Sequence, residues 1–430
     1  MFLKLNGLDR DNLQIGREQL ISVKEAQQKL LSVFHPLESE SIPLSEAAGR
    51  ILSEDVKSAI DLPLFTNSSM DGFAVRSSDV NNASRRHPVA LSVVEDIPAG
   101  KTPSVRLAKN QTARIMTGAP VPDGADGVIP VEDTDQYDPQ SRSSFDLPSE
   151  IRVFRKVRAG DYIRHQGEDV RKNEVVLHAN SPLKPQELGI LAMLGKANVS
   201  VFRPPKIAIL STGDELVPVE EPLESGQIHD SNAYTLSALI KRDHGNPEYL
   251  GIIPDNEDSV RKFLETAVAN SADLIITSAG VSVGVFDYVK TVVENDGELT
   301  FWRVNMRPGK PVVFGNYQGV PFIGLPGNPV SAFVGYEVFV RPAILRLSGI
   351  TEVPRYTIKA RLIDGNETDG RESYLRGILK YEDDEWVARL TGHQGSGNLL
   401  SLVQANALLI IPPGVKSLAA GAEVDAWLLD

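Results

Sequence analysis

A chain of 430 residues is too long for one ordinary hydrophobic core, so several domains are expected. It has 41% hydrophobic and 23% charged residues, a globular composition, and contains no apolar run of about 18 residues that would predict a transmembrane helix. The net charge of −13 argues against a basic face for nucleic acid, and the lack of cysteine excludes disulfides, thiolate metal sites and a cysteine nucleophile. A cytoplasmic protein without nucleic-acid or membrane partners is the simplest interpretation.

Helices are predicted on both sides of a β-rich segment. Ser22–Glu25 is a capping box followed by apolar residues at helical spacing, so a helix is expected there that stops near His35. A second helix is expected from Ser45 to Asp55, and a third from Pro185 to Gly195, because proline favours the first helical turn. The segment between them contains strand-like runs broken by Gly, Pro, Asn and Asp, at 73–75, 89–94, 113–116 and 127–131.

The central segment contains three short apolar runs, each followed by a loop rich in glycine and acid or amide residues. The runs are 207–210, 274–277 and 321–325, and the loops are 211–216, 278–284 and 326–331. Helical patterns alternate with these runs, which predicts parallel strands joined by crossover helices at 231–243, 259–269, 286–293 and 331–347. Loops after parallel strands gather at one edge of the sheet, where ligands bind. That edge is the candidate active site.

After Gly349 the pattern changes to alternating strands, at 356–362, 374–380, 385–390, 407–411 and 423–428. The predicted fold class is therefore a multidomain α/β protein. The expected domains are a discontinuous helical and extended domain (18–60 plus 160–203), a β-rich inserted domain (61–159), a central parallel-sheet α/β domain (204–349) and a C-terminal all-β barrel or sandwich (350–430).

Two of the central loops carry groups suited to anions and metal. Asp214 and Glu215 lie at an expected strand-to-helix turn, where free backbone amides favour anions and adjacent carboxylates favour Mg²⁺. The alternative there is a helix cap beside a solvated acid. The glycine loop 280–284, followed by Asp287, allows close backbone approach to a ligand, although the chain has no Walker A motif and no GxGxxG after a strand.

Three cations precede the apolar segment 312–314, within a frame of prolines and glycine that favours fixed side chains. Arg303, Arg307 and Lys310 are candidates for holding phosphate or oxyanion groups, the alternative being an ordinary surface turn. The loop 326–331 precedes a long helix, whose first amides either contact a phosphate or are simply capped. Neither HExxH, nor a GxSxG elbow, nor histidine spacing for a metal is present, so ordinary hydrolytic chemistry is not indicated.

Each of these motifs has modest specificity by itself. Taken together, they make the chain resemble the molybdopterin molybdenumtransferase (MoeA) family and the carboxyl-terminal domain of gephyrin. They keep the family's order and span most of the chain. The matching stretches are NSSMDGFA (67–74), IMTGAP (115–120), STGDEL (211–216), DSN (230–232), GVSVGVFDY (280–288), RPGKP (307–311), LPGNPVS (325–331) and TGHQGS (391–396).

The resemblance implies an elongated homodimer whose central domain has a molybdopterin-binding fold. The implied active site lies between that domain and the β-rich insert of the partner subunit. The implied reaction inserts molybdenum from molybdate into adenylylated molybdopterin, with Mg²⁺, and releases AMP and molybdenum cofactor. The dithiolene sulfurs of the pterin supply the molybdenum ligands, which fits a chain without cysteine. Implied partners are a molybdopterin adenylyltransferase and molybdoenzyme maturation proteins.

The resemblance also implies roles for individual residues. The implied catalytic residues are Asp71, Thr117, Asp169, Glu215, Asp255 and Asp287, with Glu215, Asp255 and Asp287 as metal ligands. The implied ligand-binding residues are Ser211, Thr212, Gly213, Asp214, Ser278, Gly280, Ser282, Arg303, Arg307, Lys310, Gly327, Asn328, Ser331, Arg376 and Ser396. Two departures from the family pattern affect ligand approach: Ala279 replaces a usual glycine, and arginine replaces a common lysine at 303 and 307.

Two other functions fit the same residues. The related α/β domain also serves adenylylation of molybdopterin by ATP, so an adenylyltransferase is one alternative. A non-catalytic, gephyrin-like scaffold that binds peptides is the other. Asp71 and the β-rich insert favour molybdenum insertion over adenylylation, and the sequence leaves open whether molybdate or tungstate is the substrate.

Overall fold

The structure is a computed structural model that describes residues 20–137, 146–279, 288–351 and 355–429. Within these ranges the chain divides into two compact units. Unit 1 contains the residues up to Ser53, Asn180–Lys184 and those from Asn198 onward, and unit 2 contains Glu54–Ala179 and Pro185–Ala197. No helix in the described ranges is both long and apolar enough to cross a membrane.

Unit 2 is built on a five-stranded sheet in the order β7-β4-β6-β5-β8. The strands are β4 (Gly72–Val75), β5 (Ser84–Ile97), β6 (Gln111–Ile115), β7 (Gly127–Pro130) and β8 (Glu150–Arg155). The four strand-like runs predicted in this segment are confirmed by β4, β5, β6 and β7. The unit also holds the predicted helix α2 (Pro185–Met193) and the short strands β2 (Val56–Lys57), β3 (Asn67–Ser68), β9 (Ile163–Arg164) and β10 (Val175–Leu177).

The helix predicted to start at Ser22 is confirmed, but the one predicted from Ser45 is wrong. Helix α1 (Val23–Leu31) begins after Ser22, whose Oγ accepts a hydrogen bond from the Glu25 amide at 3.1 Å. The 45–55 segment instead forms a short 3₁₀ turn (Leu44–Glu46) and then extended chain. Gly49 has a φ of +75°, which ends any helix, and the residues after it pair with neighbouring strands.

Unit 1 is organised around a six-stranded sheet in the order β15-β12-β16-β20-β19-β17. The strands are β12 (Lys206–Thr212), β15 (Asn246–Ile253), β16 (Leu274–Ser278), β17 (Glu298–Arg303), β19 (Pro311–Tyr317) and β20 (Val320–Leu325). The three predicted strands β12, β16 and β20 lie side by side and parallel, as expected. The sheet as a whole is mixed rather than parallel, because a tight turn returns β19 antiparallel beside β20.

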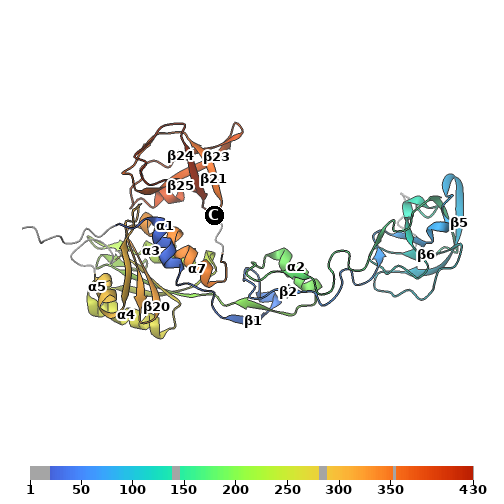
Figure 1. Cartoon of the computed structure of the whole chain (residues 1–430), viewed down its shortest axis with the longest axis horizontal. Coiled ribbons are helices and arrows are strands. Elements are labelled where there is room, and N and C mark those ends of the chain that lie inside the picture. Colours follow the sequence, from blue (N-terminus) through green and yellow to red (C-terminus); the bar gives the residue numbers. More distant parts are fainter. Residues whose placement is uncertain (1–19, 138–145, 280–287, 352–354, 430) are drawn as a thin grey trace, which may run out of the picture. The chain divides into compact units, whose positions relative to one another are not determined.

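Two layers of helices bury the two faces of this sheet (Figure 1). Ile207 and Ile209 pack on one face with α1, α3 (Ser231–Arg242) and the long C-terminal helix, whereas Ala208 and Leu210 pack on the other with α4 (Glu257–Ala269) and α5 (Tyr288–Asp296). Successive side chains of β12 therefore point to opposite faces of the sheet and belong to two separate hydrophobic cores. The long helix is three consecutive segments, α6 (Pro329–Gly335), a π-helical turn (Tyr336–Val340) and α7 (Arg341–Leu347).

The chain after residue 355 forms a closed five-stranded barrel, which decides between the barrel and the sandwich expected from the sequence. The strands are β21 (Thr357–Leu362), β23 (Glu372–Glu382), β24 (Glu385–Leu390), β25 (Ala407–Ile411) and β27 (Glu423–Leu428). The ring closes because β23 pairs with both β24 and β25. Strand β18 (Met306–Arg307), from the segment between β17 and β19, pairs with β23 and so attaches the barrel beside the cations of that segment.

Candidate active site

One edge of the central sheet collects nearly all of the predicted ligand-binding groups of unit 1. Strands β15, β12, β16, β20 and β17 run in the same direction, and β19 runs in the opposite one. The loops after the first five and the start of β19 therefore share an edge. The connection after β12 leads to α3 on one face, and the connection after β16 leads to α5 on the other. Such a reversal between adjacent strands is where α/β sheets bind ligands.

The β12–β15 end of this edge is acidic. The Asp255 amide donates to Asp214 Oδ1 at 3.2 Å, and Glu215 folds back so that a Cβ on Gly213 would lie 2.6 Å from its Oε2. Burial raises the pKa of the Asp255 carboxyl above its ordinary value, and the negative charges of Asp214 and Glu215 raise it further. The Asp255 carboxyl therefore lies close enough to two other carboxylates to be affected by their negative charge, which a nearby cation would offset.

The expected strand-to-helix turn at 211–216 is wrong. Ser211 and Thr212 are the last, buried residues of β12, and the chain then runs into the short strand β13 (Leu216–Val217). The helix starts only at Ser231, where Asp230 is the N-cap and accepts from the Ala233 amide at 3.1 Å. Asp214 is therefore exposed in a loop rather than capping a helix, which leaves its carboxylate available at the edge.

The β17–β19 end of the edge is cationic. Arg303, the last residue of β17, stacks on the neighbouring indole of Trp302, with 4.0 Å between its Cζ and the ring centroid. Lys290 also lies on that ring, with its Nζ 3.3 Å from the centroid. A guanidinium stacks on an indole better than an ammonium does, which gives a physical reason for arginine at this position.

A pocket of about 430 Å³ opens where the cationic segment meets the barrel. Four cations line it, together with groups from the 326–331 loop and from the barrel. The lining residues include Arg307, Lys310, Arg371, Arg376, Asn328, Ser331, Gln394 and Ser396. The only acid bonded to these cations within the described chain is Asp369, whose Oδ2 lies 3.8 Å from Arg307 and accepts from Arg371 Nε at 3.0 Å. Four positive charges against one negative charge leave a formal excess of three.

Arg376 is the most unusual residue of this pocket, because as a whole it is only 1% exposed. It donates to Ser401 Oγ and to the Gly395 carbonyl, both at 2.9 Å, and no carboxylate in the described ranges pairs with it. Burial and the nearby charge of Arg307 lower its pKa to about 10. A buried cation held only by neutral acceptors is stabilised when an anion binds beside it.

The 326–331 loop connects the two halves of this pocket. Asn328 is the N-cap of α6 without a side-chain cap bond, and its carbonyl accepts from the Ala332 amide at 2.9 Å. The first amide of the helix, that of Val330, donates to the Ser396 carbonyl at 3.0 Å. One amide at the start of the helix is thus bonded to the barrel. Asn328 and Ser331, on either side of it, line the pocket.

Three predicted residues lie in unit 2, and two of them meet. Asp71 Oδ1 accepts from the Thr117 amide at 2.7 Å and from Thr117 Oγ1 at 2.8 Å. Asp169 instead pairs with Arg164, and its amide donates to the Leu62 carbonyl at 2.9 Å. The structure therefore forms an acid–hydroxyl pair from Asp71 and Thr117, and places Asp169 in a separate ion pair.

Some predicted residues fall outside the described ranges, and some useful ones were missed. Gly280, Ser282 and Asp287 lie outside the residues that the structure describes. Arg371 and Asp369 were not singled out, because the sequence offers no motif around them. Their part in the pocket depends on a barrel strand pairing with β18, which no local pattern in the sequence indicates.

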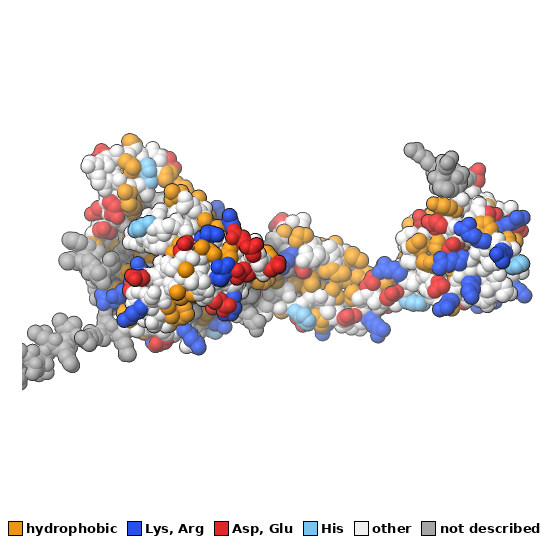
Figure 2. All heavy atoms as spheres, turned by 90° about the horizontal axis from the view of Figure 1, so that it is seen from above, with side chains coloured by type: hydrophobic (Ala, Val, Ile, Leu, Met, Phe, Trp, Pro, Cys, Tyr) orange, Lys and Arg blue, Asp and Glu red, His pale blue; other side chains and the backbone are white. Residues whose placement is uncertain are grey.

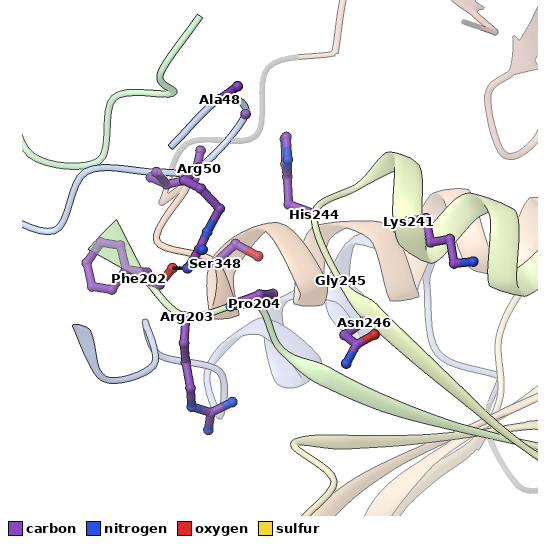
Figure 3. A pocket seen from close by; sticks show the side chains of 12 residues that line it. Ala48, Arg50, Phe202, Arg203, Pro204, Lys241, His244, Gly245, Asn246 and Ser348 are labelled. Carbon is purple, nitrogen blue, oxygen red and sulfur yellow. Dashed lines mark hydrogen bonds between the residues drawn. The ribbon is translucent and has the colours of Figure 1, made fainter. Parts of the chain in front are cut away.

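A second pocket, of about 350 Å³, lies at the opposite edge of the sheet, where β12 and β15 begin (Figure 3). Its cations do not converge on it. Arg203 is held by Asp273 at 2.6 Å, Arg50 donates to the Phe202 carbonyl at 2.9 Å, and Lys241 extends away from the other labelled side chains. This pocket therefore lacks the arrangement that an anion site needs.

The charged side chains on the surface do not form a large basic face on the side shown in Figure 2. On the face shown in Figure 2, Lys and Arg side chains are mixed with Asp and Glu side chains. The chain carries a net charge of −13. An anionic ligand is attracted by a local cluster of cations rather than by a basic face.

The fold defines the class: a multidomain α/β protein with a β-rich unit, a closed C-terminal barrel and opposite charges gathered along one sheet edge. Three family models match the chain: "MoeA N-terminal region (domain I and II)" over residues 21–195, "Probable molybdopterin binding domain" over 208–346 and "MoeA C-terminal region (domain IV)" over 362–429. The chain therefore belongs to the MoeA family, and the predicted family, fold class and enzyme assignment are confirmed.

Similar proteins cover nearly the whole chain. A molybdopterin molybdenumtransferase from Nostoc sp. is 38% identical over 90% of this chain and 88% of its own length. One from Haemophilus influenzae is 36% identical over 94% of this chain and 98% of its own. The solved structure of a molybdopterin biosynthesis moea protein from Pyrococcus horikosii superposes with a TM-score of 0.81 at 32% identity, covering 95% of this chain and 99% of that one.

Proposed function

We propose that this chain inserts molybdenum from molybdate into adenylylated molybdopterin, with Mg²⁺, and releases AMP and molybdenum cofactor. The observation that carries the proposal is the buried Arg376, which has no carboxylate partner among the described residues and lines a pocket with three more cations. The names of the relatives support transfer of molybdenum to molybdopterin. The acidic and cationic ends of the sheet edge support the proposed placement of the two substrates.

Molybdate is proposed to bind in the pocket beside Arg376. A tetrahedral dianion fits a cavity of about 430 Å³ with room for part of a second substrate. Lys310 has no ion-pair partner in the described ranges, and Arg307 is only loosely paired with Asp369 at 3.8 Å. Both side chains can therefore turn to an oxyanion without breaking a strong ion pair, and guanidinium groups bind oxyanions through two parallel hydrogen bonds.

The acidic end is proposed to hold Mg²⁺ through Glu215 and Asp255. The donor set suits a hard cation. Burial, and then the charges of Asp214 and Glu215, raise the pKa of Asp255, and a divalent ion would relieve the repulsion among these carboxylates. No group of three His, Cys, Asp or Glu side chains in the described ranges is arranged to hold a metal. Phosphate oxygens of the substrate are proposed to supply the other ligands of the ion. When bound, Mg²⁺ neutralises the phosphates and polarises the bond to the leaving AMP.

The spacing between the two ends suits an elongated substrate. Three interstrand steps separate β12 from β19, which corresponds to roughly 14 Å. The pterin nucleotide is proposed to lie along the edge, with its phosphates near Glu215 and its dithiolene group near Lys310. The protein residues then act by positioning and by neutralising charge, without a covalent intermediate on the protein.

The remaining parts of the proposal concern assembly and setting. We propose a cytoplasmic homodimer that receives its substrate from a molybdopterin adenylyltransferase and delivers its product to molybdoenzyme maturation proteins. Asp71 and Thr117 are proposed to take part in catalysis, since their hydrogen-bonded pair is exposed to solvent. Light scattering of the purified protein tests the dimer.

Single-turnover release of AMP tests the reaction. Purified protein is mixed with adenylylated molybdopterin, Mg²⁺ and molybdate, and AMP and reconstituted molybdoenzyme activity are followed together. Glu215→Ala is expected to lower the rate at least tenfold, whereas Glu224→Ala, which changes an exposed acid in the 218–227 loop, serves as the matched control. Consumption of ATP with molybdopterin, instead of AMP release, would establish the adenylyltransferase alternative.

A further inference from the structure

Asn232 lies between two loops of the sheet edge and bonds to both. It sits in the first turn of α3 and is 8% exposed. Its Nδ2 donates to Ser278 Oγ at 2.6 Å and to the Gly327 carbonyl at 2.8 Å. Both amide hydrogens are therefore used, one toward the loop after β16 and one toward the loop after β20.

The first turn of α3 is held in place independently of these two bonds. Asp230 caps the helix by accepting from the Ala233 amide, and its other carboxylate oxygen accepts from Tyr249 Oη at 2.9 Å. Asp230 is itself 3% exposed. The position of Asn232 is thus fixed by the helix start, and the loops are held relative to it.

Ala279, which follows β16, packs closely against the loop after β20. The Ala279 amide donates to the Leu325 carbonyl at 3.0 Å, and a Cβ added to Gly327 would lie 3.0 Å from Ala279 Cβ. Ala279 has a φ of +76°, a left-handed conformation that disfavours a residue with a side chain. A backbone held in such a conformation needs surrounding contacts that fix it, and the bonds of Asn232 on either side supply them.

We propose that Asn232 is a positioning residue that sets the separation between the end of β16, at Ser278, and the loop after β20, at Gly327, in the middle of the sheet edge. The loops lie between the acidic end at Glu215 and the cationic end at Lys310. Their separation therefore decides whether one elongated ligand reaches both ends at once. The inference rests on the proposed function, because it concerns binding of the pterin nucleotide. Molybdate is expected to be affected less, because its pocket is lined by Asn328 and Ser331 of the 326–331 loop but not by Asn232 itself.

The test uses an isosteric pair of substitutions. Asn232→Asp keeps the shape of the side chain but replaces the donor with an oxygen that cannot donate to the Gly327 carbonyl. Asn316→Asp makes the same change at the turn between β19 and β20, on the far edge of the sheet, where Asn316 Oδ1 accepts from the Gly319 amide at 2.7 Å and a carboxylate serves equally. Asn232→Ala is the second variant, without added charge. Thermal melting establishes that each variant is folded.

The expected result is a change in one substrate only. In both Asn232 variants the KM for adenylylated molybdopterin rises about tenfold, the effect of one or two lost hydrogen bonds, while the KM for molybdate stays within about twofold. Without any ligand, the backbone amides of residues 325–328 exchange hydrogen faster in Asn232→Ala than in wild type. Asn316→Asp changes neither quantity.

Three outcomes overturn the inference. Unchanged KM for the pterin in a folded Asn232→Ala removes the positioning role, and unchanged hydrogen exchange removes the bridge itself. Equal rises in the KM for the pterin and the KM for molybdate would show that the substitution damages the unit generally and does not act on the position of one loop. A wild-type protein that does not bind the pterin overturns the proposed function, and it is distinguished from the other outcomes because wild type itself then fails.

Discussion

Replacing Arg376 by methionine tests the oxyanion pocket at its most informative residue. The substitution removes the guanidinium of a residue that is 1% exposed and keeps a long, unbranched side chain. Within the described residues the Arg376 guanidinium donates only to Ser401 Oγ and the Gly395 carbonyl, and an anion in the pocket would be its charged partner. The variant is therefore expected to lose affinity for molybdate more than it loses the fold.

The size of the effect follows from the charge of the pocket. A hydrogen bond to a charged group contributes about 1.5–3 kcal/mol, which corresponds to a loss of affinity of roughly 10- to 150-fold. Coulomb's law sets an upper bound, about 4 kcal/mol for two unit charges at about 4 Å with an effective dielectric constant of about 20. Arg307, Lys310 and Arg371 remain, so weakened binding is expected rather than complete loss.

Isothermal calorimetry with molybdate at constant ionic strength measures this loss. Lys359→Met is the matched control, because Lys359 is an exposed barrel cation paired with Glu423 at 2.7 Å and does not line the pocket. Arg376→Lys is expected to fall between wild type and Arg376→Met, since it keeps a charge but not the fork of donors. Unchanged affinity in Arg376→Met, with a normal melting temperature, would refute the assignment of this pocket to molybdate.

Two further predictions concern the acidic end and the core. Because the pKa of Asp255 is raised in the native state, its carboxyl stays protonated there at pH values above 3.8, where the unfolded chain has lost that proton. The free energy of unfolding therefore falls as the pH rises from 3.8 through the raised pKa. Mg²⁺ is expected to restore that stability at about pH 7 but not at about pH 4, and melting curves with and without Mg²⁺ check this. Asp243→Ala is expected to cost about 3–5 kcal/mol in denaturant unfolding, because Asp243 is 4% exposed and accepts from Tyr336 Oη at 2.8 Å. Asp425→Ala, an exposed ion-pair partner of Lys359, is expected to cost less than about 1 kcal/mol.

The sequence predicted the elements whose signals are local. The Ser22 cap predicts a helix, and the patterns at 207–210 and 407–411 predict strands, each from a few neighbouring residues. The structure has all three elements. The helix expected from Ser45 failed because Gly49 adopts a left-handed conformation and distant strands offer partners to the chain after it. Tertiary pairing there overrides a weak helical pattern.

The charged residues of the edge were visible in the sequence, but their grouping was not. The run before Asp214 marks a strand end, and the shared direction of parallel strands brings such ends together. Lys310 lies at the same edge because it precedes β19, which runs antiparallel to β20. The contribution of Arg371 depends on β18 joining the barrel, and the role of Asn232 depends on two loops about 46 and 95 residues away. Contacts of such long range are set by the fold rather than by any local pattern.

Equilibrium binding of adenylylated molybdopterin, titrated with and without Mg²⁺, tests the central claim most directly. If one sheet edge holds the nucleotide between acids and cations, binding strengthens with Mg²⁺, and Glu215→Ala removes that dependence while Lys310→Met weakens binding at every Mg²⁺ concentration. A wild-type protein that shows no affinity for the nucleotide at any Mg²⁺ concentration would contradict the account.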